Sequence, residues 1–541
     1  MLTIDQTTGN TLRHALNHHR FTPAGLRELW GADIDDALTR NNAAPARWFL
    51  TGRTDPLSVL ANLFVCAATM DAEVVRTSLG TYIFDAATAT GALRERAGTV
   101  QAPFALRAIE VPPGLSDRVG EPTPDSTTDH LWLFSDHGTL TRDEPVAGDF
   151  VLGVGGAGRT LLNITPRTPV RTALDLGAGC GIQAIALARH CDHVIATDIS
   201  PRALAFTRAN ATLNGAHNIE TREGSLFEPT PEQFDLIVSN PPFVITPQGH
   251  TTTLEYRDGG HTGDQLMRTL LAQLPDHLTT SGAACLLGNW EITHATNPQS
   301  PTEDPASPTD PTNQDPTDPT HWVPSTVDIS VIEREQLTPA HYAETWIRDG
   351  GVVPGSSRWN ADTAAWLDDF ASRGVTRIAF GWIQVRARTG ETEGASDDHL
   401  PAPPIRHFES RPGPLGANPG GIAQFLDVRF DLIQWLNQAD DNELLDTAFI
   451  RNEGVVEHRH FTPGDESPTT ITIEVGTGFA REMTVDTAFA GCIGVADGSL
   501  TLRAVAHALA QLLDVEPDML ASQLVAQVRE AVVSGILYPN S

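Results

Sequence analysis

Residues 173–181 read ALDLGAGCG, and this stretch decides the fold of the central part of the chain. TALDL predicts a buried strand, GAGCG a tight turn, and the following GIQAIALARH a helix that packs on a sheet. The glycines at 177, 179 and 181 let the backbone approach a ligand closely. Strand, glycine turn and helix in this order predict a ligand site at the carboxyl end of a parallel strand.

An earlier glycine-rich stretch, GVGGAG at 153–158, satisfies the dinucleotide pattern G-x-G-x-x-G. A dinucleotide site also needs a helix long enough to cross back over the sheet. Here only RTLLNI precedes TPRTP, whose prolines end any helix near Ile164. The dinucleotide interpretation therefore fails. The glycines predict tight turns, and both a structural role and ligand contact stay open.

Runs typical of strands alternate with helical segments from about 146 to 395, which predicts an α/β domain with a Rossmann-like, doubly wound sheet. The strand runs are RTALDL, HVIATDI, NIETRE, FDLIVSN and GAACLLGNW, and STVDISVIERE and VTRIAFGWIQVRAR complete the sheet. Residues 297–320 contain seven prolines, no basic residue and almost nothing apolar. They predict a disordered surface loop inserted after the fifth strand.

The two ends of the chain predict flanking α+β domains over 1–145 and 402–541. The N-terminal region shows short helical runs, including 71–79 and 84–97, followed by a strand pair over 99–111. The C-terminal region shows two candidate strands and then helices over 501–514 and 518–535. Both patterns resemble a winged helix. For the N-terminal region, a plain helical cap on the central domain is an equal alternative.

Charge and residue usage exclude several classes of protein. The 541 residues carry a net charge of −32, and all 36 basic residues are arginines. Because there is no lysine, Schiff-base chemistry, pyridoxal phosphate anchoring and Walker-type phosphate loops are excluded. The acidity also argues against broad, nonspecific nucleic-acid binding.

Cysteine and histidine spacing predicts no metal site. The five cysteines are scattered, as in a reduced cytoplasmic protein. His14 and His18 lie four apart on a predicted helix but lack a third ligand, and the same holds for His458 and His460. The sequence contains no apolar run long enough to span a membrane and no secretion signal at its start, so we expect a cytoplasmic location.

Three motifs in order, LDLGAGCG, ATDIS and FDLIVSNPPF, resemble the class I S-adenosylmethionine-dependent methyltransferases that carry N-P-P-[FY] after the fourth strand. Small-domain rRNA methyltransferases and release-factor glutamine methyltransferases belong to this group. The resemblance implies S-adenosylmethionine as the cofactor. It implies that Asp175 lies near the cofactor's amino group and that Asp198 binds the ribose. Ser225 occupies the position where an adenine-binding aspartate is common in the family. The cofactor-binding residues predicted in this way are Asp175, Gly177, Gly179, Gly181, Asp198, Ile199, Ser225, Leu226 and Asn240.

The sequence SNPPF carries the chemistry predicted for the acceptor. In a planar amide or ring-amino nitrogen the lone pair is delocalised, so two acceptors aimed at its protons favour pyramidalisation. Asn240 Oδ1 and the Pro241 carbonyl would supply these acceptors. Pro241 and Pro242 rigidify the turn, and Phe243 can stack on a base or amide plane.

Three hypotheses describe the function. The first is methylation of an exocyclic base amine in RNA, which winged-helix-like flanks favour and the net charge opposes. The second is methylation of a glutamine side chain in a protein, a reaction that is compatible with an acidic enzyme. The third is a cofactor-binding scaffold or regulator, which an intact SNPPF disfavours. The partner is therefore expected to be RNA or a protein, and the oligomeric state is not predicted.

Overall fold

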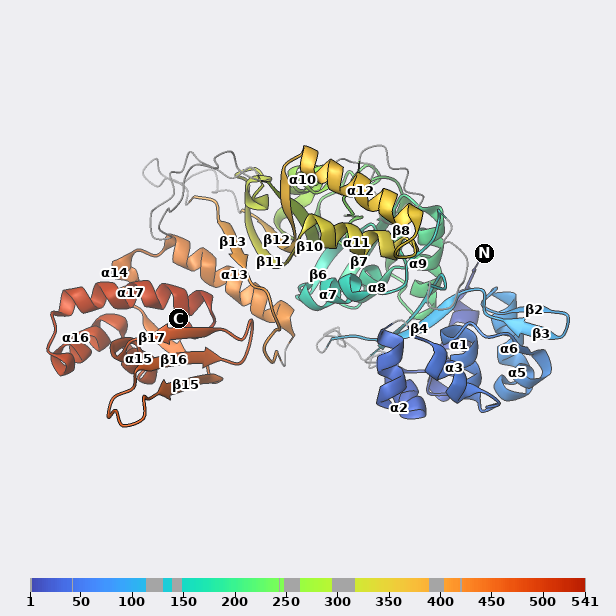
Figure 1. The fold of residues 1–541 in the computed structure, drawn as a ribbon, viewed down its shortest axis with the longest axis horizontal. Helices are drawn as coiled ribbons and strands as arrows, with labels where there is room; N and C mark the ends of the chain where they lie inside the picture. The colour runs from blue at the N-terminus through green and yellow to red at the C-terminus, as the bar shows by residue number, and fades with distance from the viewer. Residues whose placement is uncertain are drawn as a thin grey trace. The chain divides into compact units, whose positions relative to one another are not determined.

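The computed structural model describes residues 2–40, 42–112, 130–138, 148–242, 244–247, 263–293, 317–388, 403–418 and 421–540. The chain forms two compact units, Met1–Thr389 and Gly390–Ser541 (Figure 1). The first unit contains both of the regions that the sequence separates near residue 145. They form one unit because they share a hydrophobic core, in which Trp132 and Phe134 pack with Ile182 and Phe206.

A mixed sheet forms the centre of the first unit. Its strands follow the order β11-β12-β10-β9-β6-β7-β8. Neighbouring strands from β8 to β10 are parallel, and β12 is antiparallel to β10 and β11. The predicted doubly wound α/β fold is confirmed. The strands are β6 (Val170–Leu176), β7 (Cys191–Asp198), β8 (Ile219–Glu223), β9 (Phe234–Ser239), β10 (Leu278–Thr293), β11 (Val327–Leu337) and β12 (Val375–Ala387).

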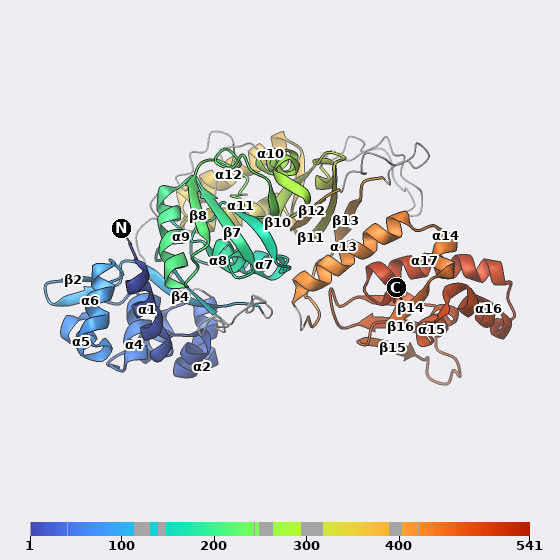
Figure 2. The same ribbon diagram turned by 180° about the vertical axis from the view of Figure 1, so that it is seen from behind.

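Helices cover both faces of this sheet (Figures 1 and 2). Leu174 and Leu176 of β6 join a core cluster with Leu270 of α10. Asp175 lies between them and points to the opposite face, because side chains alternate along a strand, and there it accepts a hydrogen bond from Ala184 N of α8. The helices are α7 (Gly156–Ile164), α8 (Ile182–Leu187), α9 (Pro201–Leu213), α10 (Gln265–Gln273), α11 (Pro339–Asp349) and α12 (Ser357–Ser372).

The N-terminal region is mostly helical but carries two small sheets. The helices are α1 (Gln6–His18), α2 (Pro23–Thr39), α3 (Ala44–Leu50), α4 (Pro56–Leu60), the π-helix η1 (Ala61–Val65), α5 (Ala72–Leu79) and α6 (Thr81–Ala89). The first sheet has the order β1-β3-β2, with β1 (Met70–Asp71), β2 (Arg94–Arg96) and β3 (Thr99–Gln101). The second pairs β4 (Ala105–Glu110) with β5 (His130–Ser135).

Two details of the sequence prediction for this region are wrong. The helix predicted over 84–97 ends at Ala89, and Arg94–Arg96 form strand β2 instead. The strand pair predicted over 99–111 does not form, since β3 pairs with β1 and β2 while β4 pairs with β5. The first error comes from a local hairpin, because β2 pairs with β3 across a two-residue turn. The second comes from partners farther along the chain, because β3 also pairs with β1 and β4 pairs with β5. The winged-helix interpretation stays a prediction.

Asn210 of α9 and Asn214, the C-cap residue of that helix, attach β5 to the central domain. Asn214 accepts a hydrogen bond from Trp132 N at 3.0 Å and donates one to Trp132 O at 2.7 Å. Asn210 accepts a hydrogen bond from Phe134 N at 2.7 Å and donates one to Phe134 O at 2.9 Å. The asparagines are four positions apart on a helix and therefore share one face, while the two strand residues are two apart and share one edge. The side chains thus satisfy backbone groups that another strand would otherwise pair.

Most of the proline-rich insert predicted over 297–320, residues 297–316, lies outside the described residues. Its last residues are not a disordered loop: Pro319–His321 form the 3-10 helix η3 and Thr320 is buried. Within the ranges that the structure covers, no helix combines the length and the apolar character needed to cross a membrane.

The second unit has its own core and two antiparallel sheets, with orders β18-β14-β19 and β15-β16-β17. The predicted helices over 501–514 and 518–535 are confirmed as α16 and α17. The helices are α13 (Ile422–Gln438), α14 (Asp441–Asp446), α15 (Thr487–Gly494), α16 (Leu502–Leu513) and α17 (Pro517–Val533). The strands are β13 (Arg406–Ser410), β14 (Ala448–Arg451), β15 (Val455–His460), β16 (Thr470–Val475), β17 (Glu482–Val485), β18 (Asp497–Thr501) and β19 (Leu537–Pro539).

A buried ion cluster stabilises β13 against α13 in the second unit. Glu409 contacts His407, Arg411 and Arg429, and the Arg429 side chain is only 3% exposed. Burial alone would raise the pKa of Glu409, but the hydrogen bond from His407 and the charges of Arg429 and Arg411 lower it to about 2. The carboxylate therefore stays ionised beside Arg429. Removing either partner would leave the other as a buried, unpaired charge, which is costly.

Replacing Asn214 tests the attachment of β5. We expect Asn214→Ala to lower the free energy of unfolding of the first unit by about 1–3 kcal/mol, because the amide N–H and carbonyl of Trp132 lose their partners. Urea titration followed by tryptophan fluorescence measures the change. Asn17→Ala in α1 is the matched control, since no hydrogen bond of that side chain is found within the described residues. Equal unfolding curves for the two variants would show that the asparagine pairs do not hold β5.

Candidate functional site

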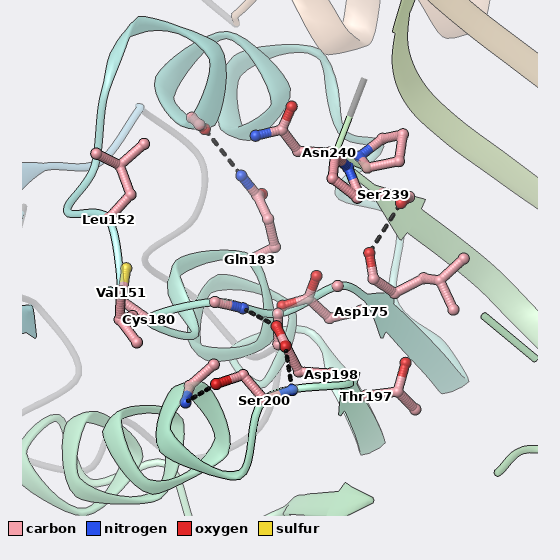
Figure 3. A pocket seen from close by; sticks show the side chains of 18 of the residues that line it. Val151, Leu152, Asp175, Cys180, Gln183, Thr197, Asp198, Ser200, Ser239 and Asn240 are labelled. Atoms are coloured by element: carbon pink, nitrogen blue, oxygen red, sulfur yellow. Dashed lines mark hydrogen bonds between the residues drawn. The ribbon is translucent and has the colours of Figure 1, made fainter. Parts of the chain in front are cut away.

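A single cavity of about 270 Å³ opens at the carboxyl ends of β6, β7, β8 and β9 (Figure 3). In a doubly wound sheet this is the crevice where the strand order reverses, and ligands bind there. Most of the residues that the sequence predicts as a site line this cavity. They are Asp175, Gly177, Gly179, Asp198, Ile199, Ser225, Leu226, Asn240, Pro241 and Pro242. Phe243 lies outside the described residues.

The glycine turn after β6 forms the floor of the cavity. Gly177 and Gly179 have φ angles of 79° and 56°, in the left-handed region that favours glycine. A Cβ atom built on either one would meet nothing within 4 Å. A side chain at these positions would therefore project into open space, which a ligand lying on the bare backbone can fill.

Gly181 has a different role from the one predicted. It does not line the cavity, although its φ of 84° also requires glycine. A Cβ atom there would lie 2.9–3.0 Å from Thr207 of α9. The glycine therefore permits close packing of the turn on α9, and the cofactor contact predicted for Gly181 does not follow from its position.

Asp198 fixes the shape of the glycine turn. Its Oδ2 accepts a hydrogen bond from Gly179 N at 2.9 Å, and its Oδ1 accepts one from Ser200 N at 2.9 Å. Each carboxylate oxygen can accept a second hydrogen bond, so both stay available to ligand hydroxyl groups. Burial raises the pKa of Asp198, and the backbone N–H groups of Ser200, Gly179 and Ile199 oppose that shift.

Asp175 is the most deeply buried carboxyl group of the site. Its Oδ2 accepts a hydrogen bond from Ala184 N at 2.8 Å. Burial raises the pKa of Asp175 to about 7; the hydrogen bond from Ala184 opposes the shift, and the charge of Asp198 adds to it. A cationic ligand group beside Asp175 would favour the ionised form and lower this pKa.

The residues that the family resemblance places near the adenine of the cofactor lie at the outer rim of the cavity. Ile199 follows β7 and is 51% exposed. Ser225 and Leu226 follow β8, and Leu226 adopts a φ of 45°, which is uncommon for a residue with a side chain. This turn brings both residues to the cavity wall. Their contact with adenine stays a prediction.

Asn240 follows β9 directly and reaches the cavity from the side opposite the β7 rim. The preceding Ser239 is fixed because its hydroxyl donates to Leu176 O at 2.8 Å, which joins the ends of β9 and β6. Asn240 Oδ1 is buried, and it has no hydrogen-bond partner within the described residues. A buried acceptor without a donor is costly. This orphaned oxygen is therefore suited to a donor supplied by a ligand.

A tyrosine holds the backbone beyond this turn. The hydroxyl of Tyr342 accepts a hydrogen bond from Ile245 N at 2.9 Å and one from Asn289 Nδ2 at 3.1 Å. Tyr342 is fully buried among the aromatic side chains of Trp366, Phe370 and Phe380. The segment that contains Asn240, Pro241 and Pro242 is thus held at both ends.

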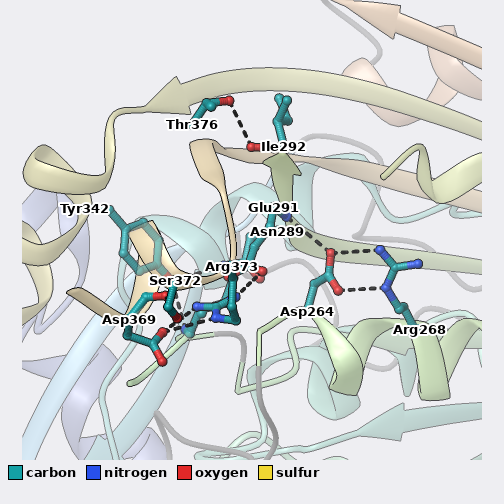
Figure 4. A network of polar contacts seen from close by, with 11 residues as sticks. Asp264, Arg268, Asn289, Glu291, Ile292, Tyr342, Asp369, Ser372, Arg373 and Thr376 are labelled. Atoms are coloured by element: carbon teal, nitrogen blue, oxygen red, sulfur yellow. Dashed lines mark hydrogen bonds and ion pairs between the residues drawn. The ribbon is translucent and has the colours of Figure 1, made fainter. Parts of the chain in front are cut away.

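A charged network lies farther along β10, next to Asn289 (Figure 4). Glu291 pairs with Arg373, which also pairs with Asp369 at 2.6 Å. Asp264 pairs with Arg268 at 2.7 Å and accepts a hydrogen bond from Glu291 N at 3.3 Å. Asp264 directly precedes α10, so the network fixes the start of the helix that carries Leu266, a residue of the cavity wall.

Sequence reasoning missed Gln183 and left the role of the first glycine stretch open. Residues Phe150–Gly155, Ala157 and Gly158 all line the cavity, so GVGGAG is part of its wall. Gln183 in the first turn of α8 also lines it and donates to Gly158 O at 2.8 Å. Because the two residues are 25 positions apart, only the packing of α7 on α8 shows their contact.

No cluster of three or more metal-ligating side chains occurs among the residues described. His14 and His18 lie on α1, and His458 pairs with Glu474 at 3.1 Å.

Residues 153–295 match the family model described as "Methyltransferase small domain". The central part of the chain is therefore similar to class I S-adenosylmethionine-dependent methyltransferases. Residues 18–103 match a separate model described as a domain of unknown function, DUF7059.

Curated relatives match the same central part. A release factor glutamine methyltransferase of Geobacter sulfurreducens is 39% identical over 120 residues, which are 20% of this chain and 42% of the relative. A ribosomal protein uL3 glutamine methyltransferase of Bradyrhizobium diazoefficiens is 34% identical over 149 residues, 25% of this chain and 46% of the relative. Among solved structures, a ribosomal protein L11 methylase of Lactobacillus delbrueckii is 30% identical and covers 21% of this chain and 50% of its own, with a TM-score of 0.17. The chain spans less than half the length of these two curated relatives.

The cofactor of this domain is S-adenosylmethionine, and the cavity fits it. Bare backbone at Gly177 and Gly179 leaves open space, Asp198 keeps free acceptor sites for hydroxyl groups, and buried Asp175 suits an ammonium group. When bound, the cofactor supplies an activated methyl group.

The raised pKa of Asp175 makes cofactor affinity depend on pH. In the free protein the folded state holds a proton on Asp175 that the unfolded state releases between about pH 4 and 7. The stability contributed by this group is therefore present at low pH and lost as the pH rises through about 7. Binding of a cation works in the opposite direction, because it requires the ionised form.

We expect the dissociation constant of S-adenosylmethionine to fall by about tenfold at most between pH 6 and pH 8, as binding displaces one proton from Asp175. Titration calorimetry at several pH values measures it. Asp175→Asn keeps an acceptor for Ala184 N and should bind more weakly, with a flatter pH profile. The amino group of S-adenosylmethionine also titrates. Equal pH dependence of affinity in the unmodified protein and in Asp175→Asn would therefore show that Asp175 is not its cause.

Proposed function

We propose that the chain is an S-adenosylmethionine-dependent N-methyltransferase that methylates the side-chain amide of a glutamine in a protein substrate. The observation that carries this proposal is the buried, unpartnered Oδ1 of Asn240 at the cavity wall. The names of the curated relatives, which are glutamine methyltransferases, support the substrate class.

Asn240 and Pro241 would orient the acceptor nitrogen. A primary amide presents two N–H donors, and Asn240 Oδ1 and the Pro241 carbonyl would accept them. Holding both protons turns the nitrogen lone pair toward the methyl group and weakens its delocalisation into the carbonyl. Asn240 and Pro241 would hold the acceptor nitrogen, and the bound cofactor would supply its methyl group and leave as the neutral thioether, while one N–H proton would pass to solvent. Pro242 and Phe243, the other predicted catalytic residues, would rigidify the turn and stack on the amide plane.

Methylation of an exocyclic base amine in RNA is the second candidate. The same two acceptors could hold an aromatic amino group, and the winged-helix interpretation of the flanks favours nucleic acid. The net charge of −32 opposes a polyanionic partner. The glutamine reading therefore has the better support.

Asn240→Ala tests the acceptor role. We expect methyl transfer to fall by at least about 100-fold, as for the loss of one preorganised hydrogen-bonding group at a reacting centre. The affinity for S-adenosylmethionine should change by less than about threefold, because the asparagine addresses the acceptor. Ser225→Ala at the opposite rim is the comparison variant and should change cofactor affinity more than turnover. If calorimetry shows that Asn240→Ala loses cofactor affinity as strongly as activity, the assigned role is wrong.

A labelling experiment tests the substrate class. The full chain is incubated with tritiated S-adenosylmethionine and cell lysate, with the Asn240→Ala variant as the background. We expect protease, and not RNase, to release the label, and mass spectrometry to place one added methyl group on a glutamine amide. Label released by RNase would establish the RNA reading, and label on another type of side chain would overturn both.

A further inference from the structure

Asp136, which lies outside the cavity, contacts both a loop of the cavity wall and the start of α9. It follows β5 in the N-terminal region, and its side chain is 7% exposed. On one side it contacts the loop Phe150–Val154, which forms part of the cavity wall. On the other it pairs with Arg202 in the first turn of α9, four residues after Asp198.

Two hydrogen bonds join Asp136 to the middle of the loop. Asp136 Oδ2 accepts from Val151 N at 2.8 Å, and Asp136 N donates to Val151 O at 3.1 Å. Both backbone groups of Val151 are therefore satisfied by one residue. The neighbouring Gly153 approaches the same strand so closely that a Cβ atom on it would lie 2.8 Å from Ser135 Oγ.

Arg202 holds the carboxylate in place. Its Nη2 donates to Asp136 Oδ1, and its Nε donates to Asp136 Oδ2 at 3.3 Å. The guanidinium lies over the rings of Phe206 and Phe104, at 5.4 Å and 5.9 Å. The paired, planar contact of an arginine with a carboxylate fixes geometry as well as charge. Asp149, the other carboxylate near Arg202, is farther away at 3.9 Å and more exposed.

The strand that carries Asp136 is itself fixed. Asn210 and Asn214 attach β5 to α9, and Asn210 also donates to Cys180 O in the glycine turn at 2.8 Å. Asp136 and Arg202 are therefore held by elements that do not depend on the loop. The loop contains Gly153 and is followed by Gly155, and glycines gain much freedom when a chain is released.

We propose that Asp136 and Arg202 form a clamp that orders residues 150–154 before the cofactor binds, so that Asp136 is a positioning residue for S-adenosylmethionine. Preordering a binding loop raises affinity because less freedom is lost when the ligand arrives. The clamp assigns a task to the N-terminal region at the cofactor site. It does not depend on whether the acceptor is a glutamine or a base, so its test is independent of the proposed substrate.

Asp136→Asn keeps the shape of the side chain and removes its charge. We expect the dissociation constant of S-adenosylmethionine to rise by about 10- to 30-fold, which is about 1.4–2 kcal/mol of binding free energy. Hydrogen exchange of the free protein should become faster at residues 150–154 and stay unchanged in β6 and β7. Calorimetry and exchange mass spectrometry of the full chain measure the two effects.

Asp328→Asn is the matched control. Asp328 is 6% exposed and pairs with Arg388 at 3.3 Å, but neither residue lines the cavity. We expect this variant to lose stability and keep its cofactor affinity within about twofold. If both carboxylate variants lose affinity in proportion to their loss of stability, Asp136 is merely structural and the proposal is overturned.

Substitutions at Arg202 separate charge from bulk. Arg202→Lys should retain more affinity than Arg202→Gln, and the double variant Asp136→Asn with Arg202→Gln should bind no more weakly than the worse single variant. Additive losses would contradict a clamp formed by the pair. If Asp136→Asn does not fold, Gly153→Ala tests the same loop without removing a charge. Unchanged affinity in Gly153→Ala would overturn the proposal.

Discussion

Two carboxylates, the half-buried Asp198 and the buried Asp175, fix the glycine turn and the start of the helix that follows it, on which the rest of the site depends. Asp198 accepts hydrogen bonds from Gly179 N and Ser200 N, and Asp175 accepts one from Ala184 N at the start of α8. Burying ionised groups is costly unless hydrogen bonds compensate them. Asp198 receives two backbone donors at its oxygens and Asp175 receives one, but burial still raises the pKa of both carboxyl groups, so the compensation is incomplete. A positively charged ligand would complete the compensation. Burial of the carboxyl groups therefore costs stability in the free protein but prepares the site for its cofactor.

The N-terminal region is structurally part of the catalytic unit. Its strand β5 has no partner other than β4 within the described sheets, and the amides of Asn210 and Asn214 satisfy its free edge. Asn210 reaches further and contacts Cys180 O in the glycine turn. Hydrogen bonds, and not only apolar packing, therefore connect β5 to the glycine turn, which gives the connection a defined geometry.

The acceptor side is held by a separate set of contacts. Ser239 fixes the entry to the Asn240 turn, and Tyr342 fixes the backbone at Ile245. The cofactor side depends on β6, β7 and α9, while the acceptor side depends on β9, β10 and α11. In the proposed function, the elements that would orient the acceptor are therefore largely distinct from those that would hold the cofactor.

The sequence by itself determined the order of strands and helices in the central domain and the cavity residues Asp175, Gly177, Asp198 and Asn240, while the cofactor class followed from the resemblance of three motifs to a known family. The order of elements and the cavity residues depend on hydrophobic periodicity, on the φ angles of glycine and on the position of a residue at the end of a parallel strand, all of which are local along the chain. Only the tertiary structure decided that Gly181 packs against Thr207, that β3 and β4 belong to different sheets and that residues 150–158 line the cavity. It also decided the pairing of Asp136 with Arg202, which lie 66 positions apart. Such contacts form between side chains whose distance in space is set by the packing of whole elements, and no local pattern in the sequence encodes that distance.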